Sequence, residues 1–131
     1  MKGYTDIKQS KELAKILPIE TADMGWNVFV DGSTRCLPIY DWDLTKNGEG
    51  SVEFIPCWSL AALLDILPNN NIISTTILRG GWKIVSTEYV PDTWWCEYED
   101  EENDKVINAS ADNPIDACYE MIVKLKELKL L

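Results

Sequence analysis

The chain has 131 residues and a net charge of −10, with 22 acidic and 12 basic side chains. Apolar residues make up 46% of it, which is typical of a folded protein with one core, so we expect a single domain over residues 1–131. The acidic balance argues against binding nucleic acid phosphates, which needs a Lys/Arg surface, and against anionic membranes. No stretch approaches the roughly 20 apolar residues of a membrane span, and the N-terminus lacks a signal peptide's apolar core, so we expect a cytoplasmic protein.

The first half of the chain predicts one helix with clear signals and leaves a second region open. Asp6 and Gln9 form a capping box that begins a helix over residues 6–17. Residues 26–40 contain short apolar runs that are compatible with two strands or with an ordered loop. The turn-forming residues of 41–50 predict a loop.

The middle of the chain predicts a short buried helix followed by an antiparallel meander. The helix lies within 57–68, where charged residues are nearly absent. Beyond it the hydrophobic period changes to two, which predicts strands over 71–79, 81–90 and 93–99. Residues 105–107 predict a further short segment of this sheet.

The last predicted element is a helix with an N-cap at Asn113, a proline at its first position and Asp116 at its third. Its apolar face comprises Ile115, Cys118, Met121, Ile122, Leu125 and Leu128. The predicted strands carry large side chains at odd and even positions alike, so we expect helices on both sides of them. The predicted fold class is therefore α+β: an antiparallel three- to four-stranded sheet flanked by helices on both faces, an α/β/α sandwich.

Four stretches resemble the phage ABA sandwich domain proteins. They are the Met-Gly-Trp within 22–26, the apolar helix 60–67, the tryptophan-led strand 81–85 and the closing segment 108–128. The resemblance implies helices flanking an antiparallel sheet and an origin in a prophage or another mobile element. It implies no activity and no catalytic residue. The chain departs from the family in residues 41–53, which look like an insertion, and in a heavier acidic run.

The chain contains no histidine, which excludes Ser-His-Asp triads, Cys-His dyads and HExxH zinc sites. Its four cysteines, Cys36, Cys57, Cys96 and Cys118, lack the C-x-x-C spacing of zinc knuckles. We interpret them as small buried hydrophobes rather than as ligands or redox groups. We expect no cofactor.

The most distinctive stretch is WWCEYEDEEND, residues 94–104. Alternation along a strand would place Trp94, Cys96 and Tyr98 on one face and Trp95, Glu97 and Glu99 on the other. The plainest interpretation is a covered strand that runs out into a solvated acidic loop. The alternative is a docking patch for a basic protein partner, with an exposed tryptophan as anchor. The predicted partner-binding residues are Glu97, Glu99, Asp100, Glu101, Glu102 and Asp104.

Two other acidic groupings are weaker candidates. Residues 43–53 partly imitate an EF-hand loop, with Gly48 at the sixth position, but the twelfth is Phe54 instead of a bidentate carboxylate. We therefore expect no metal site. Asp41 and Asp43 flank a tryptophan and are the paired carboxylates that a catalyst without histidine would use.

From these observations we predict a small acidic protein of phage or mobile-element origin that binds a protein partner without catalysis. One alternative is an enzyme without histidine that uses carboxylates on a cationic or carbohydrate substrate. Another is a structural or assembly component of a phage.

Overall fold

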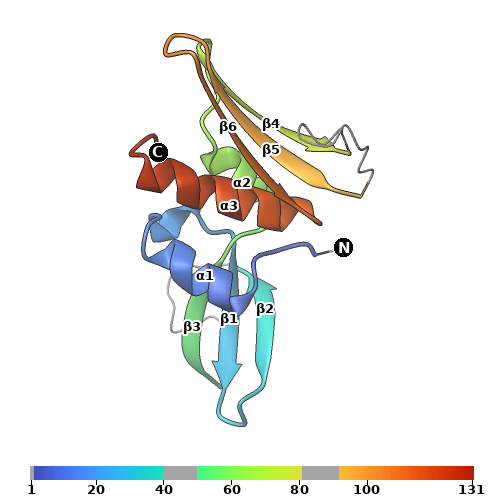
Figure 1. Cartoon of the computed structure of the whole chain (residues 1–131). Helices are drawn as coiled ribbons and strands as arrows, with labels where there is room; N and C mark the ends of the chain where they lie inside the picture. Colours follow the sequence, from blue (N-terminus) through green and yellow to red (C-terminus); the bar gives the residue numbers. More distant parts are fainter. Residues whose placement is uncertain (1, 40–49, 81–91) are drawn as a thin grey trace. The chain divides into compact units, whose positions relative to one another are not determined.

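The structure is a computed structural model that describes residues 2–39, 50–80 and 92–131 (Figure 1). The described residues form two three-stranded antiparallel sheets and three α-helices, so the predicted α+β class is confirmed. The chain divides into two compact units, Gly3–Ala62 and Leu63–Leu131, with Met1–Lys2 joining the second. The single domain stays a prediction. None of the helices in the described ranges is long and apolar enough to cross a membrane.

The unit Gly3–Ala62 begins with helix α1 (Ile7–Ala14). The Asp6 carboxylate accepts from the Gln9 amide at 2.8 Å, and the Gln9 side chain accepts from the Asp6 amide at 3.1 Å, so the predicted capping box is confirmed. The helix is shorter than predicted, and a 3-10 turn, η1 (Ile19–Thr21), follows Pro18.

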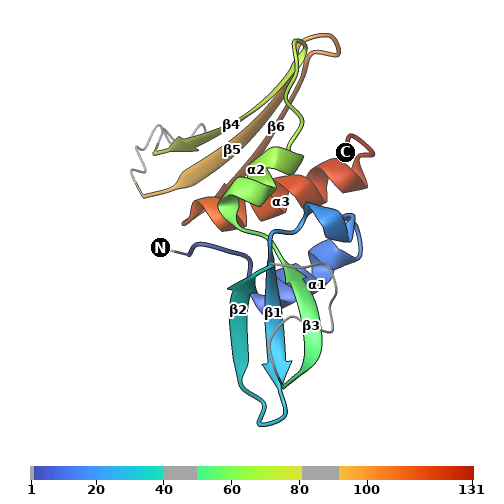
Figure 2. The same ribbon diagram turned by 180° about the vertical axis from the view of Figure 1, so that it is seen from behind.

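Of the stretch 26–40, which the sequence left open, residues 26–38 form most of a β-hairpin. Strands β1 (Met24–Phe29), β2 (Thr34–Pro38) and β3 (Ser51–Cys57) form a sheet in the order β2-β1-β3 (Figure 2). Gly32 in the hairpin turn has a φ of 84°, a conformation that few other residues adopt. Helix α1 contacts β3, and the indole of Trp26 donates to the carbonyl of Thr5 at 3.0 Å.

The second sheet corrects the predicted meander. Strands β4 (Ile73–Arg79), β5 (Trp94–Asp100) and β6 (Lys105–Ala111) lie in the order β4-β5-β6. Strand β5 pairs directly with β4 over its whole length, whereas the sequence predicted another strand, residues 81–90, between the two. Those residues fall outside the described ranges. The short segment predicted at 105–107 is a full strand that pairs with all of β5.

Two helices complete the chain. The boundary between the units falls inside α2 (Leu60–Ile66), which the sequence predicts. Helix α3 (Pro114–Glu127) begins where predicted, because the Asn113 side chain accepts from the Asp116 amide at 2.9 Å. It runs along one face of the second sheet and contacts β5 and β6 (Figure 1). Leu128 was predicted for its apolar face but is 52% exposed, because the helix ends one residue earlier.

Candidate functional site

Strand β5 has the two faces that the sequence predicts. Cys96 and Tyr98 are fully buried on the face that α3 covers. Trp95 and Glu97 on the opposite face are half-buried, and Glu99 is exposed. The structure therefore separates the core side chains of this strand from the acidic ones.

The side of the sheet opposite α3 carries nine residues in three cross-strand rows, which we call the outer face. Its register rows are Leu78–Trp95–Ser110, Thr76–Glu97–Asn108 and Ser74–Glu99–Val106. Leu78 is 50% and Val106 is 54% exposed, so apolar surface lies beside the two glutamates. None of the nine is basic. A negative and partly apolar surface results.

The outer face continues into an acidic turn, Glu101–Asp104, which connects β5 to β6. All four turn residues are exposed, and Asp104 has a φ of 47°, in the left-handed region where Asp is better tolerated than most residues. Of the six predicted partner-binding residues, five are thus on the outer face or in the exposed turn: Glu97, Glu99, Glu101, Glu102 and Asp104.

The sixth, Asp100, is placed differently, because its carboxylate is used inside the turn. It is 4% exposed and accepts from the backbone amides of Glu102 and Asn103 at 3.1 and 3.2 Å. It also accepts from the Asn103 side-chain amide at 2.8 Å. These hydrogen bonds lower the pKa of Asp100, and the bond from the Asn103 side chain has the largest effect. Asp100 therefore shapes the turn.

We expect Asp100→Asn to destabilise the protein at neutral pH, because the NH2 group that replaces the carboxylate oxygen Oδ2 cannot accept from the Asn103 side chain. The lowered pKa of Asp100 means that its stabilisation is complete above the unfolded-state pKa, about 3.9, and is lost as the pH falls through the folded-state pKa. The stability difference between variant and native protein should therefore shrink below about pH 4. Urea unfolding from pH 2 to pH 7 measures it. Glu101→Gln, the control, makes the same charge change at an exposed site in the same turn and should lack this pH dependence. If the stability difference between Asp100→Asn and the native protein stayed constant with pH, the Asp100 carboxylate would not have the role in the turn that we assign to it.

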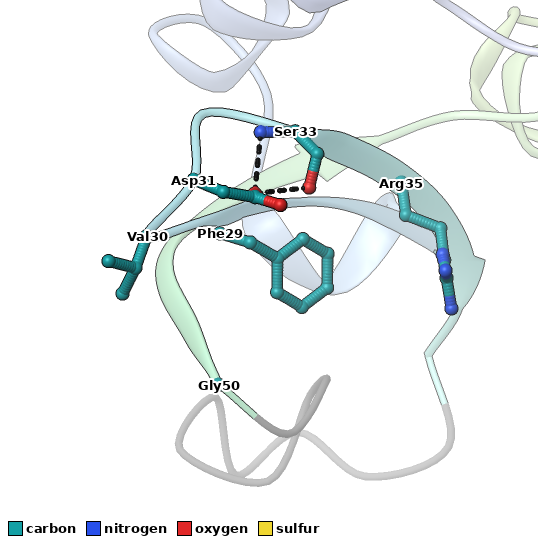
Figure 3. Close-up of a pocket in the computed structure, with 6 residues that line it drawn as sticks. All are labelled: Phe29, Val30, Asp31, Ser33, Arg35 and Gly50. Carbon is teal, nitrogen blue, oxygen red and sulfur yellow. Dashed lines mark hydrogen bonds between the residues drawn. The ribbon is translucent and has the colours of Figure 1, made fainter.

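A hollow of about 640 Å³ lies at the β1–β2 hairpin (Figure 3). Its lining residues are Phe29, Val30, Asp31, Ser33, Arg35 and Gly50. The Arg35 guanidinium lies 6.0 Å from the centre of the Phe29 ring, whereas the Val30 side chain points away from that ring. Asp31 accepts from the Ser33 hydroxyl at 2.6 Å and from its amide at 2.9 Å, and these bonds lower the pKa of Asp31. Among the described residues that line this hollow, Asp31 is the one carboxylate.

A smaller hollow of about 370 Å³ lies in the second unit, beside the N-terminus of α3. It is lined by Lys2, Arg79, Asp92, Trp94, Asp112 and Asn113. The Arg79 guanidinium lies 5.7 Å from the Trp94 ring centre and 4.0 Å from the Asp92 carboxylate. Lys2 donates to Asp116 at 2.9 Å. Opposite charges are balanced locally here, which disfavours a site for a strongly charged ligand.

One group of side chains was not predicted from the sequence. We call it the thiol–hydroxyl cluster, and it consists of Thr5, Ser10, Cys36 and Cys57. The Cys36 thiol donates to the Cys57 sulfur at 3.5 Å, and the Thr5 hydroxyl donates to the same sulfur at 3.5 Å. The Ser10 hydroxyl lies 2.8 Å from the Thr5 hydroxyl. Only Cys36 is not fully buried. The cluster therefore leads from a half-exposed thiol into the core of the first unit.

The hydrogen bonds donated to the Cys57 sulfur by Thr5 and Cys36 favour its thiolate, whereas the Cys57 thiol itself donates to the Thr5 carbonyl at 3.3 Å. The Trp58 amide donates to the Thr5 hydroxyl at 3.2 Å. When the Ser10 hydroxyl also donates to the Thr5 hydroxyl oxygen, the Thr5 hydroxyl donates its own proton to the Cys57 sulfur. The bond from Cys36, helped by Thr5 and Ser10, lowers the pKa of Cys57 to about 7. The same bond and burial raise the pKa of Cys36.

The other two cysteines also lie side by side, on β5 and α3. Cys96 and Cys118 are both fully buried, and a hydrogen bond between their thiols, with burial, raises the pKa of Cys96. The prediction that the cysteines are core residues is thus confirmed for all but Cys36. Their arrangement in two neighbouring pairs was not predicted, because only the fold brings each pair together.

The remaining sequence candidates are mostly outside the part of the chain that the structure describes. Asp41, Asp43 and most of the EF-hand-like stretch 43–53 lie outside the described residues. Within the described ranges, no three side chains of the Cys, Asp or Glu type gather closely enough to hold a metal ion. No family model, curated protein or solved structure matches the chain.

Proposed function

We propose that the protein acts without catalysis and binds a basic, partly apolar segment of a partner protein on its outer face and acidic turn. The observation that carries this proposal is the composition of one continuous β-hairpin surface. Five carboxylates, from Glu97, Glu99, Glu101, Glu102 and Asp104, surround or adjoin apolar side chains. No lysine or arginine belongs to the outer face or to the acidic turn.

Apolar side chains give this surface a means of holding a partner that charge alone lacks. Leu78 and Trp95 are direct cross-strand neighbours, and Val106 is the neighbour of Glu99. Protein interfaces commonly combine an apolar centre with a polar rim, and aromatic residues are frequent anchors. The carboxylates would speed the encounter with a basic partner and fix its register. A lysine-rich segment with alternating apolar residues suits both features.

The origin, location and architecture of the protein belong to the same proposal. A phage or mobile-element origin is supported by the resemblance to the phage ABA sandwich domain proteins. The resemblance also favours a sandwich with helices on both faces of one sheet, whereas the binding proposal requires the outer face of the second sheet to be open, as the exposure of Leu78 and Val106 indicates. Action in the cytoplasm is supported by the four cysteines, which are free thiols.

Charge reversal on the hairpin tests the binding proposal. The probe is a synthetic peptide of alternating lysine and leucine, and its dissociation constant is measured by fluorescence anisotropy. Each exposed ion pair contributes about 0.2–1 kcal/mol, and a reversal replaces attraction by repulsion. Glu99→Lys with Glu101→Lys should therefore weaken binding about tenfold or more, and the effect should fade in high salt.

The matched control is Glu120→Lys with Glu127→Lys, which makes the same charge change at exposed sites on α3. This control should bind the peptide within about twofold of the native protein. Equal weakening by both pairs would show that net charge alone attracts the peptide and would overturn the proposal. Backbone amide shifts in NMR spectra should change in β5 and β6 upon binding; changes confined to the β1–β2 hairpin would also contradict it.

A further inference from the structure

Cys36 and Cys57 lie on strands that another strand separates. Cys36 on β2 pairs with Trp26 of β1, and Cys57 on β3 pairs with Met24 of β1. Neighbouring strands are about 4.8 Å apart, so these cysteines are about two strand spacings apart at their backbones. A disulfide needs Cα atoms within about 7 Å and sulfurs about 2.05 Å apart. The central strand β1 thus opposes a bond between the two sulfurs, although they lie only 3.5 Å apart.

The same separation suits a metal ion shared by the two sulfurs. Bonds of about 2.3 Å from each sulfur to one ion hold the sulfurs about 3.8 Å apart at a tetrahedral angle and about 4.6 Å apart in a line. From 3.5 Å the pair needs to open by only a few tenths of an ångström to about one ångström. Rotation of the two cysteine side chains about their Cα–Cβ bonds can supply this opening while β2 and β3 stay paired with β1.

The donor set selects the kind of ion. Zinc in proteins requires three or four ligands, and no third Cys, Asp or Glu among the described residues joins the two thiols. Thiolates prefer soft ions, and Cu(I) is a soft ion that accepts two sulfur ligands. The ion can reach the site from solvent through Cys36, which is half-buried. On the buried side, the Thr5 hydroxyl orients the Cys57 sulfur by a hydrogen bond and is itself hydrogen-bonded to Ser10.

We propose that Cys36 and Cys57 form a two-thiolate site for a soft monovalent ion of the Cu(I) class. Binding forms two metal–sulfur bonds and releases the two thiol protons, with no change in oxidation state. The site is independent of the outer face and the acidic turn, so it stands or falls separately from the partner-binding proposal.

Titration of the reduced full chain with Cu(I) under anaerobic conditions, against a coloured Cu(I) chelator, tests the site. We expect the native chain to bind one ion and the Cys36→Ser variant to bind none. The fold should tolerate this substitution, because the Cys36 side chain is only half-buried. Thr5→Val removes the hydroxyl that orients Cys57 and should weaken binding about 10–100-fold. Circular dichroism confirms that each variant is folded.

Cys118→Ser is the matched control, because it breaks the other thiol pair, which is fully buried. It should retain the ion. Loss of Cu(I) in Cys118→Ser with retention in Cys36→Ser would overturn the assignment, as would no retention by the native chain. A third contrary result is a disulfide between Cys36 and Cys57, found by mass spectrometry after the native protein is treated with peroxide. It would show that the two sulfurs can approach to bonding distance despite the strand between them.

Discussion

Ile122→Ala should lower the free energy of unfolding by about 2–5 kcal/mol, the range for truncating a buried aliphatic side chain to alanine. Ile122 is fully buried on α3, the helix that contacts β5 and β6. Its removal leaves a cavity that the surrounding side chains fill only in part. Urea unfolding measures the loss, and amide hydrogen exchange should show weaker protection in β5, β6 and α3.

Val123→Ala is the control for this substitution, because Val123 is the next residue on α3 and is only half-buried. It removes a similar volume, and alanine has the higher helix propensity. We expect a loss below about 1 kcal/mol. Equal losses for the two variants would show that Ile122 does not pack in the core of its unit.

Gly25→Ala should lower the free energy of unfolding by about 1–3 kcal/mol. Gly25 is buried in the central strand β1, and a Cβ atom there would overlap with Cε2 and Cζ of the Phe54 ring. The ring must therefore leave its position. The loss of backbone freedom in the unfolded chain would by itself stabilise the variant by about 0.4–1 kcal/mol, so a net loss requires the clash to dominate. Thermal and urea unfolding decide the sign.

Phe54→Ala identifies the cause of that loss. If the clash with the ring is responsible, Gly25→Ala should cost much less in the Phe54→Ala background than in the native one. The coupling between the two substitutions should reach about 0.5–3 kcal/mol. Additive effects, or a Gly25→Ala variant as stable as the native protein, would rule the clash out.

Local signals in the sequence predicted the helices well. The capping box of Asp6 and Gln9 and the N-cap of Asn113 lie where expected, because each is a contact between residues three positions apart. Errors concern the ends: α1 is shorter than its apolar pattern, and Leu128 lies just beyond α3. A periodic pattern does not show where hydrogen bonding stops.

Strand pairing was harder to predict, because neighbours in the sequence need not be neighbours in a sheet. The sequence predicted residues 81–90 as the strand between 71–79 and 93–99, yet β4 pairs directly with β5. A sequence run of six acids likewise gives no hint that Asp100 turns inward, since its partners are set by the geometry of the turn. The alternation along β5 was predictable, because it follows from the strand alone.

The positions of the buried cysteines allow local unfolding of each unit to be measured by thiol alkylation. Cys36 and Cys57 belong entirely to the first unit, and Cys96 and Cys118 to the second. Under native conditions, alkylation of Cys57 would follow local opening of the first unit, whereas alkylation of Cys96 and Cys118 would follow opening of the second. Equal alkylation rates at all three cysteines would indicate that the chain unfolds in one cooperative event. Unequal rates would indicate that the two units unfold independently.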